Sequence, residues 1–176
     1  PANVNKTYVS DNEAYVQTFG PKTNIGYNYA FGDSNVNFGA IGNINKFRAD
    51  GTDTAGGKTL LSYMGYVNAK IVAGAITLIA TADYGVNEGN MGFGDYNRNG
   101  DFHSAALVNG KFKDTTTYEG ALELMYKIDP FSIGCGFGYV HSENSSWTKM
   151  ANPLAGKENT LMSAYVEGVV PVNAYV

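Results

Sequence analysis

The sequence predicts an all-β protein in which antiparallel strands follow one another up and down as a meander. Apolar and polar residues alternate with period two in segment after segment, which is typical of strands because successive side chains of a strand point to opposite faces of a sheet. Glycine (22 residues) and aromatic side chains (13%) are frequent. The connections between these segments are alternately short and long along the chain. These observations favour one β-domain over residues 1–176.

The segments that we expect to form strands are 23–31, 36–47, 59–70, 75–85, 117–127, 131–141 and 159–170. In the first two, aliphatic and aromatic residues alternate mainly with asparagine and glycine. The third alternates less clearly, because Met64 and Tyr66 make its second face partly apolar. The fourth alternates again, with Leu78 on one face and Thr77 and Thr81 on the other.

Segment 117–127 also fits a helical template, but a helix would leave Leu124 on the wrong face, whereas a strand misplaces no charged residue. The turn Asp129-Pro130 then leads directly into 131–141, where three alternate positions are glycine. Because glycine at every second position is unfavourable in a helix, the two segments are predicted to form a hairpin. The final segment, 159–170, alternates in the same way but less strongly.

The connections between these segments alternate in length. The short ones are Gly32–Asn35, Ile71–Gly74 and Ile128–Pro130, and the long ones are 48–58, 86–116 and 142–158. All tight turns would therefore lie at one end of the sheet and all long loops at the other. This is the layout of an antiparallel up-and-down transmembrane β-barrel, whereas soluble sandwiches and Greek keys mix loop lengths at both ends.

The two faces of the predicted strands also favour a barrel in a membrane. Bulky apolar residues form one continuous face, and the opposite face carries asparagine, glycine, serine, threonine and charged residues. A membrane barrel turns its apolar face to lipid and its polar face to water. A soluble secreted β-domain with one buried face would show the same alternation and stays an alternative. We expect Tyr27, Phe38, Leu78, Leu122, Ile133 and Phe137 to face lipid, and Asn28, Asn43, Thr81, Glu123 and Gly136 to face the lumen.

Aromatic residues are spaced as two belts on the apolar face. Tyr118 and Tyr126 are eight residues apart, as are Phe131 and Tyr139. Eight residues span about 26 Å of strand, or about 20 Å of height at a tilt near 40°. This height is close to the separation of the two aromatic girdles of membrane barrels.

The charged residues on the lumen-facing side are expected to line the pore. They are Lys70, Asp83, Glu119, Glu123, Lys127 and Glu167. Four of the six are acidic, which predicts a weak preference for cations. The small residues of 131–141 on this side would leave room for water or for the loop 86–116 folded inward. A net charge of −4 without any cluster of Lys and Arg argues against a nucleic-acid partner.

The loop 86–116 contains a pattern of oxygen-bearing side chains that resembles the start of a calcium loop. The candidate Ca²⁺ ligands are Asp95, Asn97, Asn99 and Asp101. The twelfth position is Ala106 and not a bidentate glutamate, so a missing ligand would have to come from another loop. The alternative is an ordinary surface loop, in which these residue types are also frequent.

Catalysis is not expected. His141 has Ser142 and Glu143 beside it, but the partners of a nucleophile–base arrangement cannot be placed from the sequence. The stretch Gly51–Thr59 lacks the first glycine of a phosphate-binding loop. The single Cys135 excludes an internal disulfide, and no segment reaches the ~18 apolar residues of a membrane helix.

Over residues 23–176, with strand–turn–strand segments such as Tyr126-Lys127-Ile128-Asp129-Pro130-Phe131, the chain resembles the porin-like barrels of Gram-negative outer membranes. The resemblance implies an outer-membrane location, tight turns on the periplasmic side, and passive diffusion of small hydrophilic solutes or ions. Its partners would be outer-membrane lipid, these solutes and, in a homo-oligomer, its own copies. A structural or adhesive barrel whose long loops bind a partner is the alternative function.

The strand count predicts that the chain is a portion of a larger barrel. Seven strands are clear, Pro1–Val9 is a candidate for another that the loop Ser10–Lys22 would join, and 171–176 resembles the start of one more. Bacterial barrels made of one chain have an even number of strands.

Overall fold

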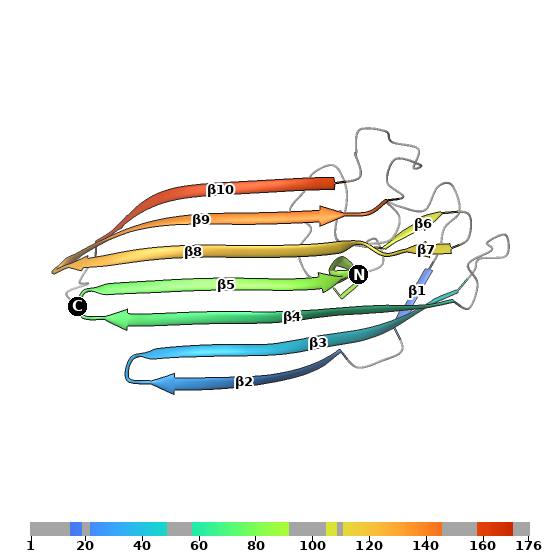
Figure 1. Ribbon diagram of the computed structural model, residues 1–176, viewed down its shortest axis with the longest axis horizontal. Coiled ribbons are helices and arrows are strands. Elements are labelled where there is room, and N and C mark those ends of the chain that lie inside the picture. Colours follow the sequence, from blue (N-terminus) through green and yellow to red (C-terminus); the bar gives the residue numbers. More distant parts are fainter. Residues whose placement is uncertain are drawn as a thin grey trace, which may run out of the picture.

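Seven long strands form one antiparallel sheet, in which strands that follow one another in the sequence lie side by side (Figure 1). This computed structural model describes residues 15–18, 22–48, 58–91, 105–108, 111–145 and 158–170. The long strands are β2 (Thr23–Phe31), β3 (Ser34–Arg48), β4 (Lys58–Ala73), β5 (Ile76–Val86), β8 (Thr116–Ile128), β9 (Phe131–Glu143) and β10 (Glu158–Val169). The predicted all-β, up-and-down antiparallel architecture is confirmed. Within the described residues the sheet is open, with β2 and β10 at its edges, so the expected closure into a barrel is not seen there.

Two-residue turns join the strands at one end of the sheet, called here the turn end. These turns are Gly32-Asp33, Gly74-Ala75 and Asp129-Pro130, the last with a cis peptide bond. Gly32 and Gly74 have φ values of 56° and 61°, which favour glycine and match the first position of a type II′ hairpin turn. The strand ends that flank the three long connections lie at the opposite end, called the loop end, as the alternation of connection lengths predicts (Figure 1).

Short elements at the loop end differ from the prediction. β1 (Tyr15–Thr18) lies within the predicted loop Ser10–Lys22, yet it pairs with the last four residues of β3 and continues the line of β2 along the same edge. The predicted loop 86–116 contains the 3-10 helix η1 (Glu88–Met91) and a hairpin of β6 (Ala106–Val108) and β7 (Lys111–Lys113). Three or four residues hold too few side chains to display a period, so alternation could not predict these elements.

Three predictions lie outside the described residues. They are the candidate calcium ligands in 95–101 and the candidate strands at 1–9 and 171–176. Among the residues that the structure describes, no helix is long and apolar enough to cross a membrane.

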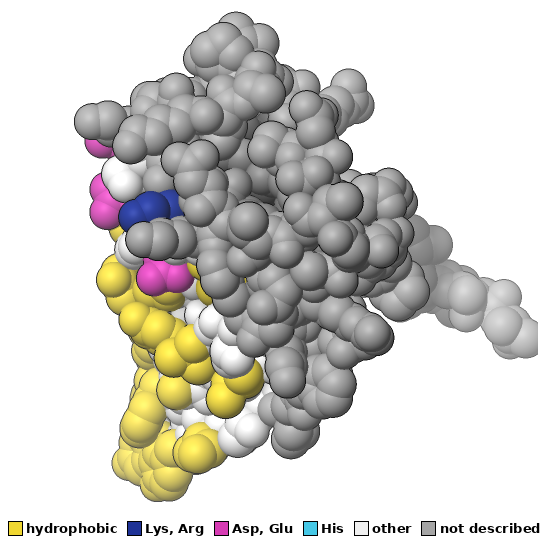
Figure 2. Space-filling view, turned by 90° about the vertical axis from the view of Figure 1, so that its right-hand side faces the viewer, with side chains coloured by type: hydrophobic (Ala, Val, Ile, Leu, Met, Phe, Trp, Pro, Cys, Tyr) yellow, Lys and Arg dark blue, Asp and Glu magenta, His cyan; other side chains and the backbone are white. Residues whose placement is uncertain are grey.

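The pairing of the strands gives the sheet one apolar face. A row of directly opposed residues on this face runs through Tyr27, Phe38, Val67, Ala82, Gly120, Tyr139 and Met162. All six residues predicted to face lipid lie on this face. Five of the six side chains are exposed, with 58% of Tyr27 and 49% of Phe137 accessible, and Leu78 is half-buried. Figure 2, seen from the loop end, shows hydrophobic side chains gathered along one flank of the molecule.

Aromatic residues form two belts at the ends of the apolar face. The loop-end belt is Tyr63, Tyr84, Tyr118 and Tyr139, and the turn-end belt is Tyr29, Phe31, Tyr126 and Phe131. Neighbouring rings in the belts contact each other: the Tyr118 and Tyr139 ring centroids are 6.1 Å apart, and those of Tyr29 and Phe31 are 5.6 Å apart. The spacing within the β8–β9 hairpin predicts the positions of four of these residues.

The polar face is covered at the loop end and open toward the turn end. Near the loop end, Leu60 packs with Ala105 and Phe112 from the segment between β5 and β8, and Ser62 is fully buried. The helix η1 of the same segment contacts β4 and β3. Nearer the turn end of the polar face, Asn28, Lys70, Thr81 and Lys127 are exposed. Part of the 86–116 connection therefore folds over the polar face of the sheet.

Candidate functional site on the polar face

The six charged residues predicted to line a pore share the polar face of the sheet. The register of β4, β5, β8, β9 and β10 places Lys70, Asp83, Glu119, Glu123, Lys127 and Glu167 on this side. Asn28, Asn43, Thr81 and Gly136, predicted to face the lumen, lie there too. Among the described residues, the apolar face carries no Asp, Glu, Lys or Arg between its two belts, so in this part of the sheet the charged side chains lie on the polar face. A pore-lining role for these residues stays a prediction.

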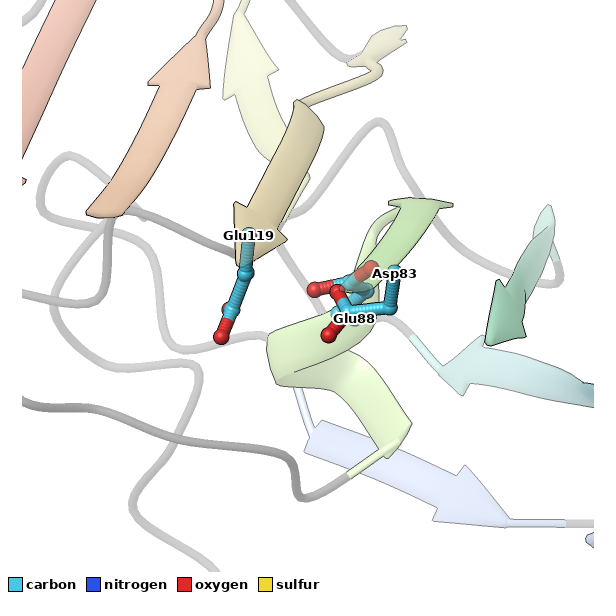
Figure 3. Close-up of side chains that lie close together, drawn as sticks. All are labelled: Asp83, Glu88 and Glu119. Atoms are coloured by element: carbon cyan, nitrogen blue, oxygen red, sulfur yellow. The ribbon is translucent and has the colours of Figure 1, made fainter. Parts of the chain in front are cut away.

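Three carboxylates converge near the loop end of the polar face and form an acidic cluster (Figure 3). Asp83 of β5 and Glu119 of β8 are directly opposed in the register, and Glu88 of η1 joins them. One oxygen from each residue lies within 4.8 Å of the other two. Glu88 is 1% exposed, and the other two side chains are half-buried.

Glu88 is directed onto the sheet by the turn that follows β5. Asn87 adopts a φ of 58°, a left-handed conformation that asparagine tolerates better than most residues. Its backbone N–H donates to the Thr115 carbonyl (2.8 Å), and its side-chain oxygen accepts from the Thr115 N–H (2.9 Å). Its amide nitrogen donates to the Leu61 carbonyl (3.1 Å) and to Asp114 (2.8 Å). This network reverses the chain, and the Glu88 side chain lies over Gly85, where a Cβ would meet it.

The acidic cluster attracts positive charge. Carboxylates this close repel one another when ionised, so a nearby cation or a shared proton lowers the energy of the group. Carboxylate oxygens are also the preferred ligands of Ca²⁺ and Mg²⁺, although these three residues alone would leave part of either coordination shell to water or other groups. Glu88 was missed because the sequence does not show that the chain folds back after Val86. The signal that could have found it is Asn87, a residue type favoured where φ is positive.

Glycines of β9 make room for the side chains of β10. Along the polar face, a Cβ at Gly134 would meet Glu167, one at Gly136 would meet Tyr165, and one at Gly138 would meet Ser163. These three β10 residues are the direct register partners of the three glycines. The space directly above these glycines is therefore taken by side chains of the neighbouring strand, and a lumen that holds water or an inward loop stays a prediction.

Tyrosine side chains cross glycines at two places on the polar face. Tyr165 crosses Gly136 and donates a 2.8 Å hydrogen bond to a carboxylate oxygen of Glu123 on β8. Tyr66 of β4 crosses Gly39 of β3 and donates a 3.2 Å hydrogen bond to Asn24 of β2. Each ring spans one strand and bonds to the next, because the intervening glycine has no side chain to block it.

His141 belongs to the aromatic surface of the opposite face. Its ring stacks on Tyr118 at a centroid distance of 4.7 Å, and its Nδ1 lies 2.7 Å from the Thr160 hydroxyl. Ser142 points to the other face of β9, where its hydroxyl is 3.1 Å from that of Thr117. The two neighbours are therefore separated by the sheet, and His103 lies outside the described residues.

Comparison with known proteins finds no family model, no curated protein and no solved structure that matches this chain.

Proposed function

We propose that this protein is a porin-like outer-membrane β-barrel, or a portion of one, through which small hydrophilic solutes or ions diffuse passively. The observation that carries the proposal is the exposed apolar face, on which the described strands have no acidic or basic residue between two aromatic belts. Soluble monomers rarely expose apolar patches larger than a few hundred Å². Lipid is the surrounding that makes such a face favourable, since strands of outer-membrane barrels present an apolar band flanked by aromatic girdles.

The dimensions of the sheet support a membrane span. Strands β8 and β9 are 13 residues long, more than the 9–11 or so residues that a tilted transmembrane strand needs. From Tyr118 to Tyr126 the apolar part of β8 extends about 26 Å, or about 20 Å in height at a 40° tilt. Residues beyond the loop-end belt, such as Glu143 and Glu158, would lie in the headgroup region or outside it.

The opposite face supports the proposed aqueous path. Asparagine, serine, threonine and six charged residues alternate with the apolar positions, so the two faces would meet two different solvents. By the same architecture, the two-residue turns would lie on the periplasmic side and the long connections outside the cell.

A structural or adhesive barrel is the second candidate function. It is favoured by η1, Ala105 and Phe112, which lie over the loop end of the polar face and would narrow or fill an aqueous path. In that case the folded loop end would bind a partner.

Ion conductance separates the two candidates. Purified protein in detergent is added to a planar lipid bilayer in KCl, and stepwise current increases are expected from a channel. Stable insertion without current steps would contradict the channel and support the scaffold. A protein that stays monodisperse without detergent and does not bind lipid vesicles would contradict both and support a soluble secreted β-domain.

A further inference from the structure

The polar face carries a tyrosine and a carboxylate in an arrangement suited to a particular class of solute. We propose that Tyr165 and Glu123 form a binding platform for neutral polyhydroxylated solutes, that is, carbohydrates. The proposal rests on the proposed channel in one respect, that this face lines the path of the solute. The platform can be tested for binding whether or not the protein conducts ions.

The platform is held in place by its neighbours. The Cε1, Cζ and hydroxyl of Tyr165 occupy the space that a Cβ at Gly136 would take, so the ring rests across β9. Its hydroxyl donates to Glu123 at 2.8 Å, which fixes the far end of the ring. Even so, 45% of Tyr165 remains exposed. An aromatic side chain is thus presented to the solvent in a fixed orientation.

Glu123 keeps acceptor capacity beside the ring. An ionised carboxylate has about four lone-pair sites and no donor, and Tyr165 uses one of them. Ser163, exposed above Gly138, adds a hydroxyl on the same side of β10. The platform therefore combines an apolar ring with acceptors at its edge and one group that can both donate and accept.

Sugars match this combination. A pyranose ring presents a patch of C–H groups, which pack against an aromatic ring, and a rim of hydroxyls, which donate to carboxylates. Binding sites for small molecules commonly join aromatic surface with a few fixed polar groups in this way. An inorganic cation would instead favour the acidic cluster at Asp83, which offers three carboxylates where the platform offers one.

A similar arrangement recurs elsewhere on the same face. Tyr66 crosses Gly39 and lies directly opposite Asp83, which in turn is opposite Glu119. Glu119 and Glu123 are four residues apart on β8, which separates the two tyrosines by about 13 Å along the strands. The four strand steps from β4 to β10 separate them by about 19 Å across the sheet, so they belong to two separate sites on the same face.

The test uses the full chain in detergent micelles and a linear glucose trisaccharide. Saturation-transfer NMR detects transfer from protein protons to the sugar C–H protons, and a titration gives the apparent affinity. We expect binding by the wild type, about tenfold weaker binding by Tyr165→Ala, and weaker binding by Glu123→Gln. Tyr165→Phe keeps the ring over Gly136 and should retain binding that Tyr165→Ala loses. A polyethylene glycol of similar mass, which lacks the hydroxyl rim, should show no such transfer.

Leu161→Ala is the matched control, because Leu161 is an exposed residue of β10 on the same face and contributes no aromatic ring. It should bind the trisaccharide as the wild type does. No binding by the wild type, or equal binding by Tyr165→Ala, overturns the platform even if the protein conducts K⁺. Binding that depends on Tyr165 in a protein that does not conduct K⁺ upholds the platform and contradicts the channel.

Discussion

The hydroxyl of Tyr165 donates a hydrogen bond to Glu123, a residue two strands away in the sheet. The bond is possible because Gly136, on the strand between them, has no side chain on the polar face. Glycine is a weak strand former, but at this position Gly136 leaves the space in which the Tyr165 ring lies. The order of the three residues across β8, β9 and β10 fixes which side chain can reach which.

Gly136→Ala should therefore destabilise the sheet by about 1–3 kcal/mol, because the added methyl would occupy the position of the Tyr165 ring. Gly168→Ala is the control, since a Cβ there meets nothing within 4 Å. Unfolding in guanidinium chloride, monitored in lipid vesicles, gives both free energies. Equal stability of the two variants would show that the ring moves aside without cost.

Leu122→Arg should destabilise the folded protein in a bilayer by about 2–4 kcal/mol if the position lies near mid-membrane. The cost arises because the guanidinium would be placed in hydrocarbon on the apolar face. Ala121→Arg, at the next position of β8 but on the polar face, should cost less. Vesicle unfolding curves measure the difference, and equal costs at the two positions would contradict the assignment of the faces.

We predict that the proposed channel is weakly selective for cations, since the acidic cluster would raise the local cation concentration at the loop end. The selectivity should fade as salt shortens the Debye length from about 10 Å at 0.1 M to about 3 Å at 1 M. Reversal potentials across a KCl gradient measure it.

Asp83→Asn combined with Glu119→Gln should reduce this selectivity, because two of the three clustered charges are lost. The matched control is Glu143→Gln with Glu158→Gln, an opposed and exposed acidic pair at the loop end of the apolar face. An anion-selective wild type, or a larger effect in the control, would refute a role for the cluster.

Asn87→Gly should cost about 1–3 kcal/mol of stability, because glycine keeps the positive φ but leaves the Leu61 carbonyl and the Thr115 N–H without their buried partner. Asn87→Ala should cost about 1–2 kcal/mol more, since alanine is also strained at that φ. Asn28→Ala, at an exposed position of β2, should change stability by less than about 0.5 kcal/mol. Thermal or denaturant unfolding that ranks the three variants differently would contradict the proposed role of the Asn87 turn.

Calcium binding by the 95–101 loop predicts a rise in melting temperature with added CaCl₂, since a ligand bound only by the folded state stabilises it. Asp95→Asn with Asp101→Asn should abolish this rise, whereas Asp83→Asn should not. If the opposite pattern is measured, the ion binds at the acidic cluster. Magnesium chloride at the same ionic strength is the control.

The sequence predicts the sheet well because apolar and polar residues alternate along each strand, whichever face of the sheet is buried. The seven long strands, the turns at Gly32 and Gly74, and the shared face of Lys70 and Glu167 all follow from alternation and turn chemistry. β1 was not predicted because the four residues Tyr15–Thr18 are too few to show an alternation of apolar and polar side chains.

The geometry of the site was harder to predict, because it depends on register. Asp83 and Glu119 could be assigned to one face from the sequence, but their direct opposition is set by the pairing of β5 with β8. The connection between those strands is 29 residues long (87–115), so its length does not fix the pairing. Likewise, the bond between Tyr165 and Glu123 depends on two pairings, one of them across the long β9–β10 connection.

The directions of the edge strands carry a geometric consequence. Seven alternating strands make β2 and β10 run the same way, both toward the two-residue turns. Joining these two edges directly would create a parallel seam in an otherwise antiparallel sheet. A seam-free antiparallel cylinder therefore needs an odd number of further strands, and those next to β2 and β10 must run from the turns toward the loops. Two identical sheets in the same membrane orientation cannot meet this condition by joining their edges, because fourteen strands would close with two parallel seams.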